Sequence, residues 1–140
     1  MKKKNEQKGF TLIEILVVLA IIGLLAGLIG PQVMKQFSSS KPKAARLQIE
    51  GLVSALDLYR LDSGRYPTNG QGLQALIQQP DGLNNWNGPY LRKSSIPKDP
   101  WDRAYEYVYP GRKAEFEVFS LGADGQAGGE GEDVDIYSWE

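Results

Sequence analysis

The chain has 140 residues, with 16 Lys and Arg, 17 Asp and Glu, and neither His nor Cys. This length suits one folded domain with an appendage. The missing His and Cys exclude histidine triads, thiol nucleophiles, disulfides and zinc sites built from thiolate or imidazole, so any metal would be a hard cation held by oxygen. A net charge of −1 gives no general attraction to nucleic acid, and we expect no nucleic-acid partner.

The charges are segregated along the chain. The first nine residues form a basic head with Lys2, Lys3, Lys4 and Lys8 against Glu6. Residues 115–140 contain eight acids and no base. A basic head and an acidic tail require separate explanations.

The stretch from Phe10 to Gly30 is apolar apart from Glu14 and Thr11. A helix of this length spans about 31 Å, the thickness of a bilayer's hydrocarbon layer. The basic head would stay in the cytoplasm and the rest of the chain would cross the membrane. A secretory signal would have a shorter apolar stretch without an acid. We therefore predict a single transmembrane and assembly helix over residues 10–31.

Glu14 is the one charged residue of this segment. A carboxylate within the apolar layer costs about 2.5–3.5 kcal/mol, so by default it has a partner or a task. It either snorkels to the membrane surface or pairs with a positive group. Because no Lys or Arg occurs between Lys8 and Lys35, the positive group would be a new amino terminus made by cleavage before Phe10.

The residues Lys8-Gly9-Phe10-Thr11-Leu12-Ile13-Glu14, followed by an apolar helix, resemble the class III signal of type IV pilins and related pseudopilins. The resemblance implies that a membrane prepilin peptidase cleaves between Gly9 and Phe10, removing residues 1–9 as a leader, and that Phe10 is then N-methylated. It also implies that Glu14 pairs with the Phe10 amine of a neighbouring subunit during assembly.

An amphipathic helix follows from Ala44 to Leu61. Its apolar residues recur at steps of three and four, and they are Ala45, Ile49, Leu52, Val53, Leu56 and Tyr59. This stripe predicts a surface on which the rest of the domain folds.

Turn residues from Asp62 to Pro67 end this helix, and a short helix is predicted near residues 69–79 with Leu73, Leu76 and Ile77 inward. Residues 80–100 are predicted to form a loop, which we expect Trp86, Tyr90 and Trp101 to anchor into the core. Alternating residues at 105–109 and 115–120 flank a turn and predict an antiparallel hairpin. The fold class is α+β.

Three further stretches resemble the family of major pseudopilins of the type II secretion system: residues 58–68, Gln71-Gly72-Leu73 and Asp99-Pro100-Trp101. Type IV pilins usually have a carboxy-terminal cysteine pair, which this chain lacks. One departure is the stretch 136–139 (Ile-Tyr-Ser-Trp), where the family more often has Ile-Gly-Asn-Trp. The resemblance implies a type IV pilin-like fold, with residues 32–140 forming a periplasmic globular domain anchored in the bacterial inner membrane.

The stretch from Ser120 to Ile136 is a glycine-rich acidic loop. Its acids repel one another and its glycines free the backbone, so an ordered loop of this composition favours a divalent cation. Calcium fits an oxygen-only ligand set, although the spacing is not that of an EF-hand and a disordered, solvated tail is the alternative. The family resemblance implies Ca²⁺ bound by the side chains of Asp124, Asp133 and Asp135 and the carbonyls of Leu121 and Gln126.

The resulting functional prediction is a structural protein and not an enzyme. The subunit would form a homo-oligomeric helical filament, the periplasmic pseudopilus, and drive export of folded proteins across the outer membrane. The resemblance implies minor pseudopilins, an inner-membrane assembly platform and prepilin peptidase as partners. The alternatives are a type IV pilus subunit for adhesion, motility or DNA uptake, and a membrane-anchored hydrolase using Asp133 and Asp135. The hydrolase is disfavoured because a flexible loop does not hold two acids rigidly apart.

Overall fold

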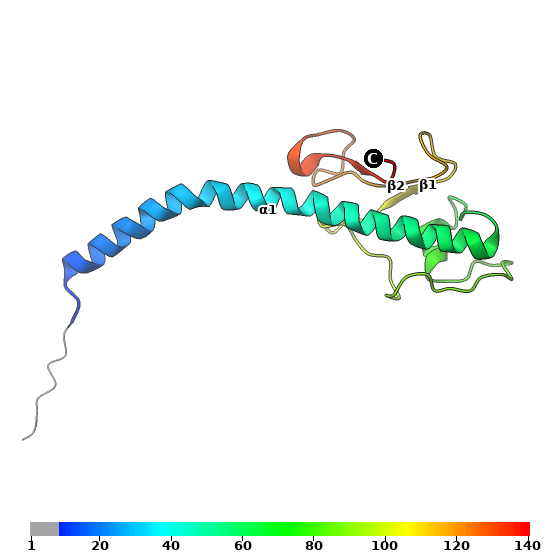
Figure 1. The fold of residues 1–140 in the computed structure, drawn as a ribbon, viewed down its shortest axis with the longest axis horizontal. Helices are drawn as coiled ribbons and strands as arrows, with labels where there is room; N and C mark the ends of the chain where they lie inside the picture. Colours follow the sequence, from blue (N-terminus) through cyan, green and yellow to red (C-terminus); the bar gives the residue numbers. More distant parts are fainter. Residues whose placement is uncertain (1–8) are drawn as a thin grey trace, which may run out of the picture. The chain divides into compact units, whose positions relative to one another are not determined.

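The structure is a computed structural model that describes residues 9–140, the side chains of 35–39 excepted. It has the predicted α+β class, with a long helix and a small antiparallel sheet (Figure 1). The elements in the described residues are α1 (Leu12–Ser63), η1 (Gly72–Leu76), β1 (Glu106–Val108), β2 (Glu117–Ser120), η2 (Gly131–Asp133) and β3 (Ile136–Tyr137). Of the predicted leader, residues 1–8 lie outside the described residues.

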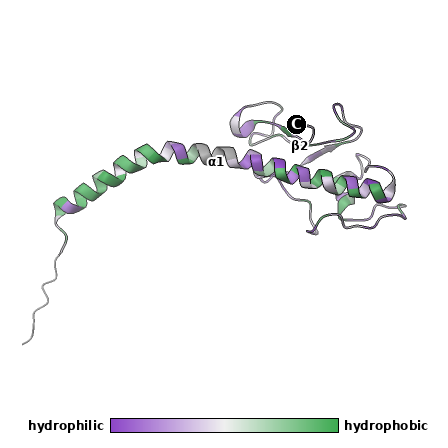
Figure 2. Ribbon diagram, in the orientation of Figure 1, coloured by the Kyte–Doolittle hydropathy of each residue, from purple (hydrophilic) through white to green (hydrophobic). Residues whose placement is uncertain are grey.

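The chain divides after Phe37 into two compact units. In the first unit the large apolar side chains of α1 are exposed from Leu12 to Met34, and Figure 2 colours most of this segment as hydrophobic. Pro31 lies within α1, so the boundary predicted after residue 31 falls inside a helix. A helix that is apolar all round requires apolar surroundings, either a lipid or other protein.

The second unit, Ser38–Glu140, contains the buried core. The predicted stripe of α1 is confirmed, because Ala45, Ile49, Leu52, Leu56 and Tyr59 are at most 2% exposed. Val53 packs against the same core as a partly buried residue. Burial of this stripe stabilises the second unit, since each large apolar side chain that is buried contributes about 1.5–3 kcal/mol.

The predicted helix stop is confirmed at Gly64. Gly64 has φ of +78° and its N–H donates to the carbonyl of Arg60 over 2.7 Å, the left-handed cap that ends many helices. Beyond it, the short helix predicted near residues 69–79 is the five-residue 3-10 helix η1, in which Leu73 and Leu76 are buried as expected. Ile77, also predicted to point inward, is only partly buried. The predicted anchors Trp86, Tyr90 and Trp101 all pack against the core.

The three strands form one antiparallel sheet in the order β1-β2-β3. The predicted hairpin is confirmed, with Tyr107 paired to Val118. Val118 and Ile136 are buried, at 0% and 2% exposure, whereas Phe119 and Tyr137 are paired neighbours that are only partly buried. One face of the sheet therefore contributes to the core and the other forms part of the surface.

Two buried carboxylates fix the loops at the two ends of β2. Glu117 accepts hydrogen bonds from the backbone N–H groups of Arg112 (3.0 Å) and Lys113 (2.8 Å). Asp99 accepts one from Ser120 Oγ over 2.6 Å and one from the N–H of Arg103 over 2.8 Å. Both acids are satisfied where they are buried, so they act as supports for the turn before β2 and the loop after it.

We predict that Leu56→Ala lowers the free energy of unfolding of the fragment Ser38–Glu140 by about 2–5 kcal/mol, because it opens a cavity in a fully buried stripe. Denaturant titration measures this change. The matched control is Leu58→Ala on the same helix, where Leu58 is 52% exposed and the expected loss is below about 0.5 kcal/mol. Equal losses at both positions would contradict the core assignment.

Candidate functional site

The amino-terminal end of α1 is capped by its own side chains. Thr11 precedes the first helical residue, and its N–H donates to Glu14 Oε2 over 2.7 Å. The N–H of Glu14 in turn donates to Thr11 Oγ1 over 3.3 Å, and Thr11 Oγ1 donates to the same Oε2 over 2.9 Å. This reciprocal pair is a capping box. The structure thus gives Glu14 a partner within its own chain.

The predicted processing point lies just outside this cap. Gly9 and Phe10 are exposed and precede the helix, with the Phe10 side chain 86% exposed. A Cβ added at Gly9 would have no atom within 4 Å. Within the described residues, no neighbouring atom requires a glycine at position 9.

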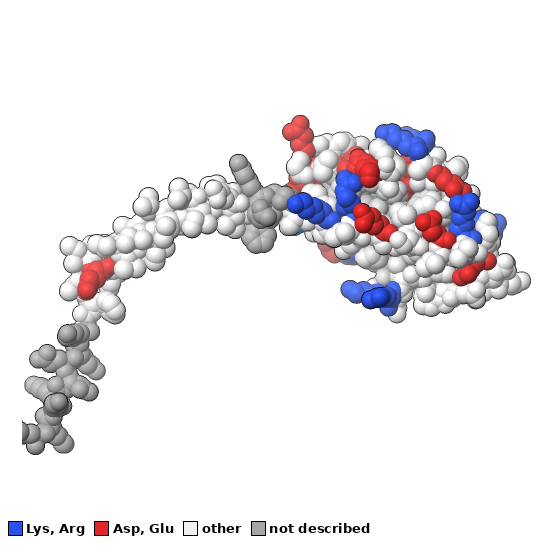
Figure 3. Space-filling view, viewed as in Figure 1, with Lys and Arg blue, Asp and Glu red and all other residues white. Residues whose placement is uncertain are grey.

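The apolar segment of α1, Leu12–Met34, is long and apolar enough to cross a membrane. Figure 3 shows one acidic patch on this otherwise uncharged segment, and by sequence that acid is Glu14. A signal sequence near an amino terminus passes the same test of length and composition, so the helix alone does not identify a permanent anchor.

The acidic loop between β2 and β3 is folded back on itself at its glycines. The N–H of Ala123 donates to the carbonyl of Glu132 over 2.8 Å. Gly122 has φ of +64°, and a Cβ there would lie 2.8 Å from the carbonyl oxygen of Asp133. A Cβ added at Gly129 would lie 2.5 Å from that same oxygen. The structure therefore brings residues 121–129 against residues 132–133 through the backbone.

Among the five predicted calcium ligands, Asp135 has one carboxylate oxygen that accepts hydrogen bonds and one that is buried. Its Oδ2 accepts hydrogen bonds from the N–H of Gly128 (2.9 Å) and from Tyr137 Oη (3.3 Å). Its Oδ1 is buried and has no hydrogen-bond partner among the residues that the structure describes. Burial raises the pKa of the Tyr137 phenol, and the neighbouring carboxylate of Asp135 adds to that rise.

The other predicted ligands are placed around the same loop. Asp124 Oδ1 accepts the N–H of Gln126 over 3.0 Å, and the carbonyl of Leu121 accepts the N–H of Gly125 over 3.1 Å. Within residues 9–140, the structure gathers no three acidic, His or Cys side chains into a group that could hold a metal ion. The donors fit calcium in kind, as carboxylate and carbonyl oxygens with one buried carboxylate oxygen unpaired.

Arg103 supports the start of the acidic loop and was not identified from the sequence. Its Nη1 donates to the carbonyl of Gly122 over 3.0 Å. A Cβ at Gly125, which has φ of +68°, would lie 2.3 Å from that same nitrogen. The loop thus receives one positive charge from the chain itself. No periodicity indicates this contact, because Arg103 reaches the loop from a turn 19 residues earlier.

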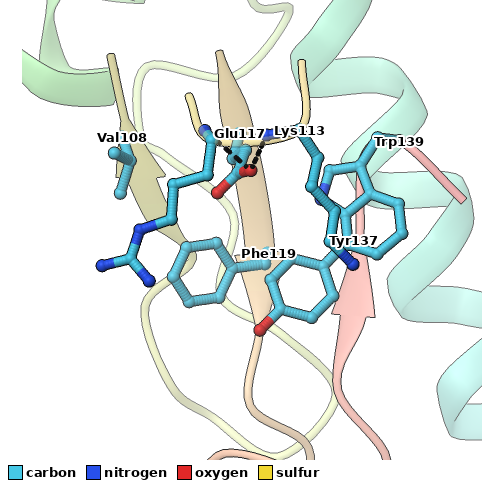
Figure 4. A pocket seen from close by; sticks show the side chains of 7 residues that line it. Val108, Lys113, Glu117, Phe119, Tyr137 and Trp139 are labelled. Carbon is cyan, nitrogen blue, oxygen red and sulfur yellow. Dashed lines mark hydrogen bonds between the residues drawn. The ribbon is translucent and has the colours of Figure 1, made fainter. Parts of the chain in front are cut away.

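A second site missed by the sequence analysis is a cleft on the outer face of the sheet, which we call the aromatic cleft (Figure 4). It has a volume of about 350 Å³ and is lined by Val108, Arg112, Lys113, Glu117, Phe119, Tyr137 and Trp139. The ring centroids of Phe119, Tyr137 and Trp139 follow one another at 5.0 Å. Lys113 Nζ lies 3.9 Å from the Trp139 ring centroid. The outward position of Phe119 in the alternating run 115–120 was the available signal.

Comparisons with known proteins bear on the whole chain. The family model described as "Type II secretion system (T2SS), protein G" matches residues 32–139, and that of the "Prokaryotic N-terminal methylation motif" matches residues 4–30. The type II secretion system core protein G of Pseudomonas aeruginosa is 46% identical over 99% of both chains. That of Vibrio cholerae is 44% identical over 99% of this chain and 96% of its own.

A solved structure supports the fold. The crystal structure of the major pseudopilin from the type 2 secretion system of enterohaemorrhagic Escherichia coli has a TM-score of 0.65 and 34% identity, covering 78% of this chain and 95% of that one. The type IV pilin-like fold and the predicted family are therefore confirmed. The matches favour the type II secretion interpretation over a type IV pilus subunit, and they show that the chain belongs to the type II secretion system protein G family, that of the major pseudopilins.

Proposed function

We propose that this chain polymerises into the periplasmic pseudopilus of the type II secretion system and so drives export of folded proteins across the outer membrane. The observation that carries the proposal is the apolar segment Leu12–Met34, exposed along its length and joined to a folded unit, Ser38–Glu140. In the membrane this surface contacts lipid, and in a filament it contacts other copies. Repeated head-to-tail contacts that do not close produce filaments. The proposed role is structural, in agreement with the pseudopilin family to which the chain belongs.

The proposed location is the bacterial inner membrane, with one pass. The four lysines among residues 1–8 would remain cytoplasmic. The folded unit Ser38–Glu140 would then lie in the periplasm, where the pseudopilus assembles. The proposed partners are further copies of the chain, minor pseudopilins and an inner-membrane assembly platform.

We also propose that prepilin peptidase cleaves between Gly9 and Phe10 and that Phe10 is then N-methylated. The match to the N-terminal methylation motif supports this step. Cleavage would leave the Thr11 N–H as an amide, so the Thr11–Glu14 cap survives it. The new Phe10 amine would be free to pair with Glu14 of a neighbouring copy through its second carboxylate oxygen, Oε1.

Glu14→Gln tests the proposed function. We expect normal membrane insertion, because the substitution removes a charge from an apolar segment. We expect loss of most filaments and of secretion of a folded exoenzyme, because the pairing with a charged amine is lost. Electron microscopy of sheared filaments and an exoenzyme assay in a complemented deletion strain measure the two effects. Full secretion by the variant would argue against polymerisation guided by Glu14.

Gly9→Leu tests the processing step. The leader should remain attached, because the bulky side chain changes the residue before the cleaved bond. Mass spectrometry of the chain extracted from membranes shows whether residues 1–9 are still present. The matched control is Gly30→Leu, at another glycine with no atom within 4 Å of an added Cβ, which should be processed normally. Removal of the leader from the Gly9 variant would refute the assignment.

We further propose that the acidic loop binds Ca²⁺ through the side chains of Asp124, Asp133 and Asp135 and the carbonyls of Leu121 and Gln126. Support comes from the buried, unpaired Oδ1 of Asp135 and from the oxygen-only donors of the loop. The ion would supply positive charge to a stretch of mutually repelling acids. The expected affinity is modest, with Kd of about 10⁻⁴–10⁻³ M as in extracellular modules.

Asp124→Asn tests the calcium site while keeping an oxygen that can accept the Gln126 N–H. Calcium should raise the melting temperature of wild-type Ser38–Glu140 by several degrees, and Asp124→Asn should reduce this shift to less than half. The matched control, Asp81→Asn, changes an exposed acid outside the loop and should keep the full shift. A wild-type fragment whose melting does not respond to calcium or chelator would overturn the proposal.

A further inference from the structure

The outer face of the sheet has a row of aromatic side chains, next to the exposed Glu106 that pairs with Phe119. An antiparallel sheet that packs one face on a core normally presents polar side chains on the other face. Here Phe119 and Tyr137 are cross-strand neighbours on that outer face, and Trp139 extends the row (Figure 4). The cleft of about 350 Å³ beside them reaches the size at which pockets receive a ligand or side chains of a partner.

The rim of the aromatic cleft is positively charged. Arg112 is exposed, and its guanidinium has no partner among the residues that the structure describes. Lys113 is also exposed and lies over the Trp139 ring. The one acid in the lining, Glu117, is 7% exposed and is held by two backbone N–H groups. The cleft therefore fits an acidic segment that also contains an apolar side chain.

The chain's own acidic loop has this chemistry. Residues 121–135 contain five acids and no base. Glu130 is exposed and Glu132 is partly exposed, and neither carboxylate has a partner in the described part of the chain. Val134 is an exposed apolar residue of the same loop, at 37%. Neither glutamate is among the proposed calcium ligands, so both remain negative when the ion is bound.

The loop and the basic turn lie at opposite ends of the sheet. Arg112 and Lys113 precede β2, whereas the acidic loop follows β2 and leads into β3 (Figure 1). In a head-to-tail arrangement, the turn of one copy would face the loop of the next. We propose that the acidic loop of one copy docks on the aromatic cleft and basic turn of a second copy. This contact is heterologous and does not close on itself, as a filament requires. The inference rests on the polymerisation proposed above.

Charge reversal in the full-length chain, assembled by its own secretion system, tests the docking. The variant Arg112→Glu with Lys113→Glu should reduce filament yield about tenfold or more, because like charges then face each other. Glu130→Lys with Glu132→Lys should do the same. Combining all four substitutions should restore filaments. The matched control reverses the same dipeptide elsewhere, Arg92→Glu with Lys93→Glu, at exposed residues outside the sheet, and should leave yield unchanged.

Disulfide trapping gives a measurement that does not depend on charge. Because the chain has no cysteine, Arg112→Cys with Glu130→Cys introduces the only two thiols. Oxidation of assembled filaments should give a ladder of covalent oligomers, whereas Arg92→Cys with Glu130→Cys should not.

Three results separate the two proposals. Absence of filaments from the wild type would overturn the polymerisation itself. Wild-type filaments without the disulfide ladder, or undiminished by the reversal at Arg112 and Lys113, would overturn only the docking. Capture of an exported acidic protein by the Arg112→Cys variant, in place of a second copy, would also overturn it.

Discussion

The apolar surface of α1 from Leu12 to Met34 is the constraint on which the rest depends. A helix satisfies its backbone hydrogen bonds internally, so this segment can enter lipid at little cost although no other part of the described chain covers it. Helices in lipid associate by packing and by a few polar contacts, since the hydrophobic effect does not distinguish lipid from apolar protein. Under the proposed function, the same surface would serve both a membrane-resident subunit and a polymer.

Glu14 shows how one carboxylate is made compatible with both environments. Its Oε2 is occupied by the N–H and hydroxyl of Thr11, which reduces the cost of placing the acid in an apolar layer. Its other oxygen remains for a second partner. The motif of Thr followed three residues later by Glu was readable in the sequence as a capping box. The sequence analysis predicted that Glu14 pairs with the Phe10 amine of a neighbouring subunit. The structure adds a partner in the same chain, Thr11.

Periodic features of the sequence were predicted well, whereas single contacts between loops were not. The stripe from Ala45 to Tyr59 and the hairpin about residues 110–113 follow from repeats of three to four and of two residues. The strand β3 has only two residues, which show no period. The buried Oδ1 of Asp135 and the reach of Arg103 to Gly122 arise from tertiary packing of loops, which no local pattern encodes.

The loops at the two ends of the sheet supply charged groups that can fix the register between neighbouring copies, which an apolar helix does not fix. Packing between smooth apolar helices changes little when one slides along another, so it sets no register by itself. Charges at fixed positions do set a register, because complementary groups attract in one alignment and like charges repel in others. Arg112 and Lys113 before β2 and the acids after it give each folded unit a basic end and an acidic end. Arg103 holds the start of the acidic loop, and Asp135 Oδ1 is buried there without a hydrogen-bond partner among the described residues. A calcium ion there would order the end of the subunit that has to match its neighbour.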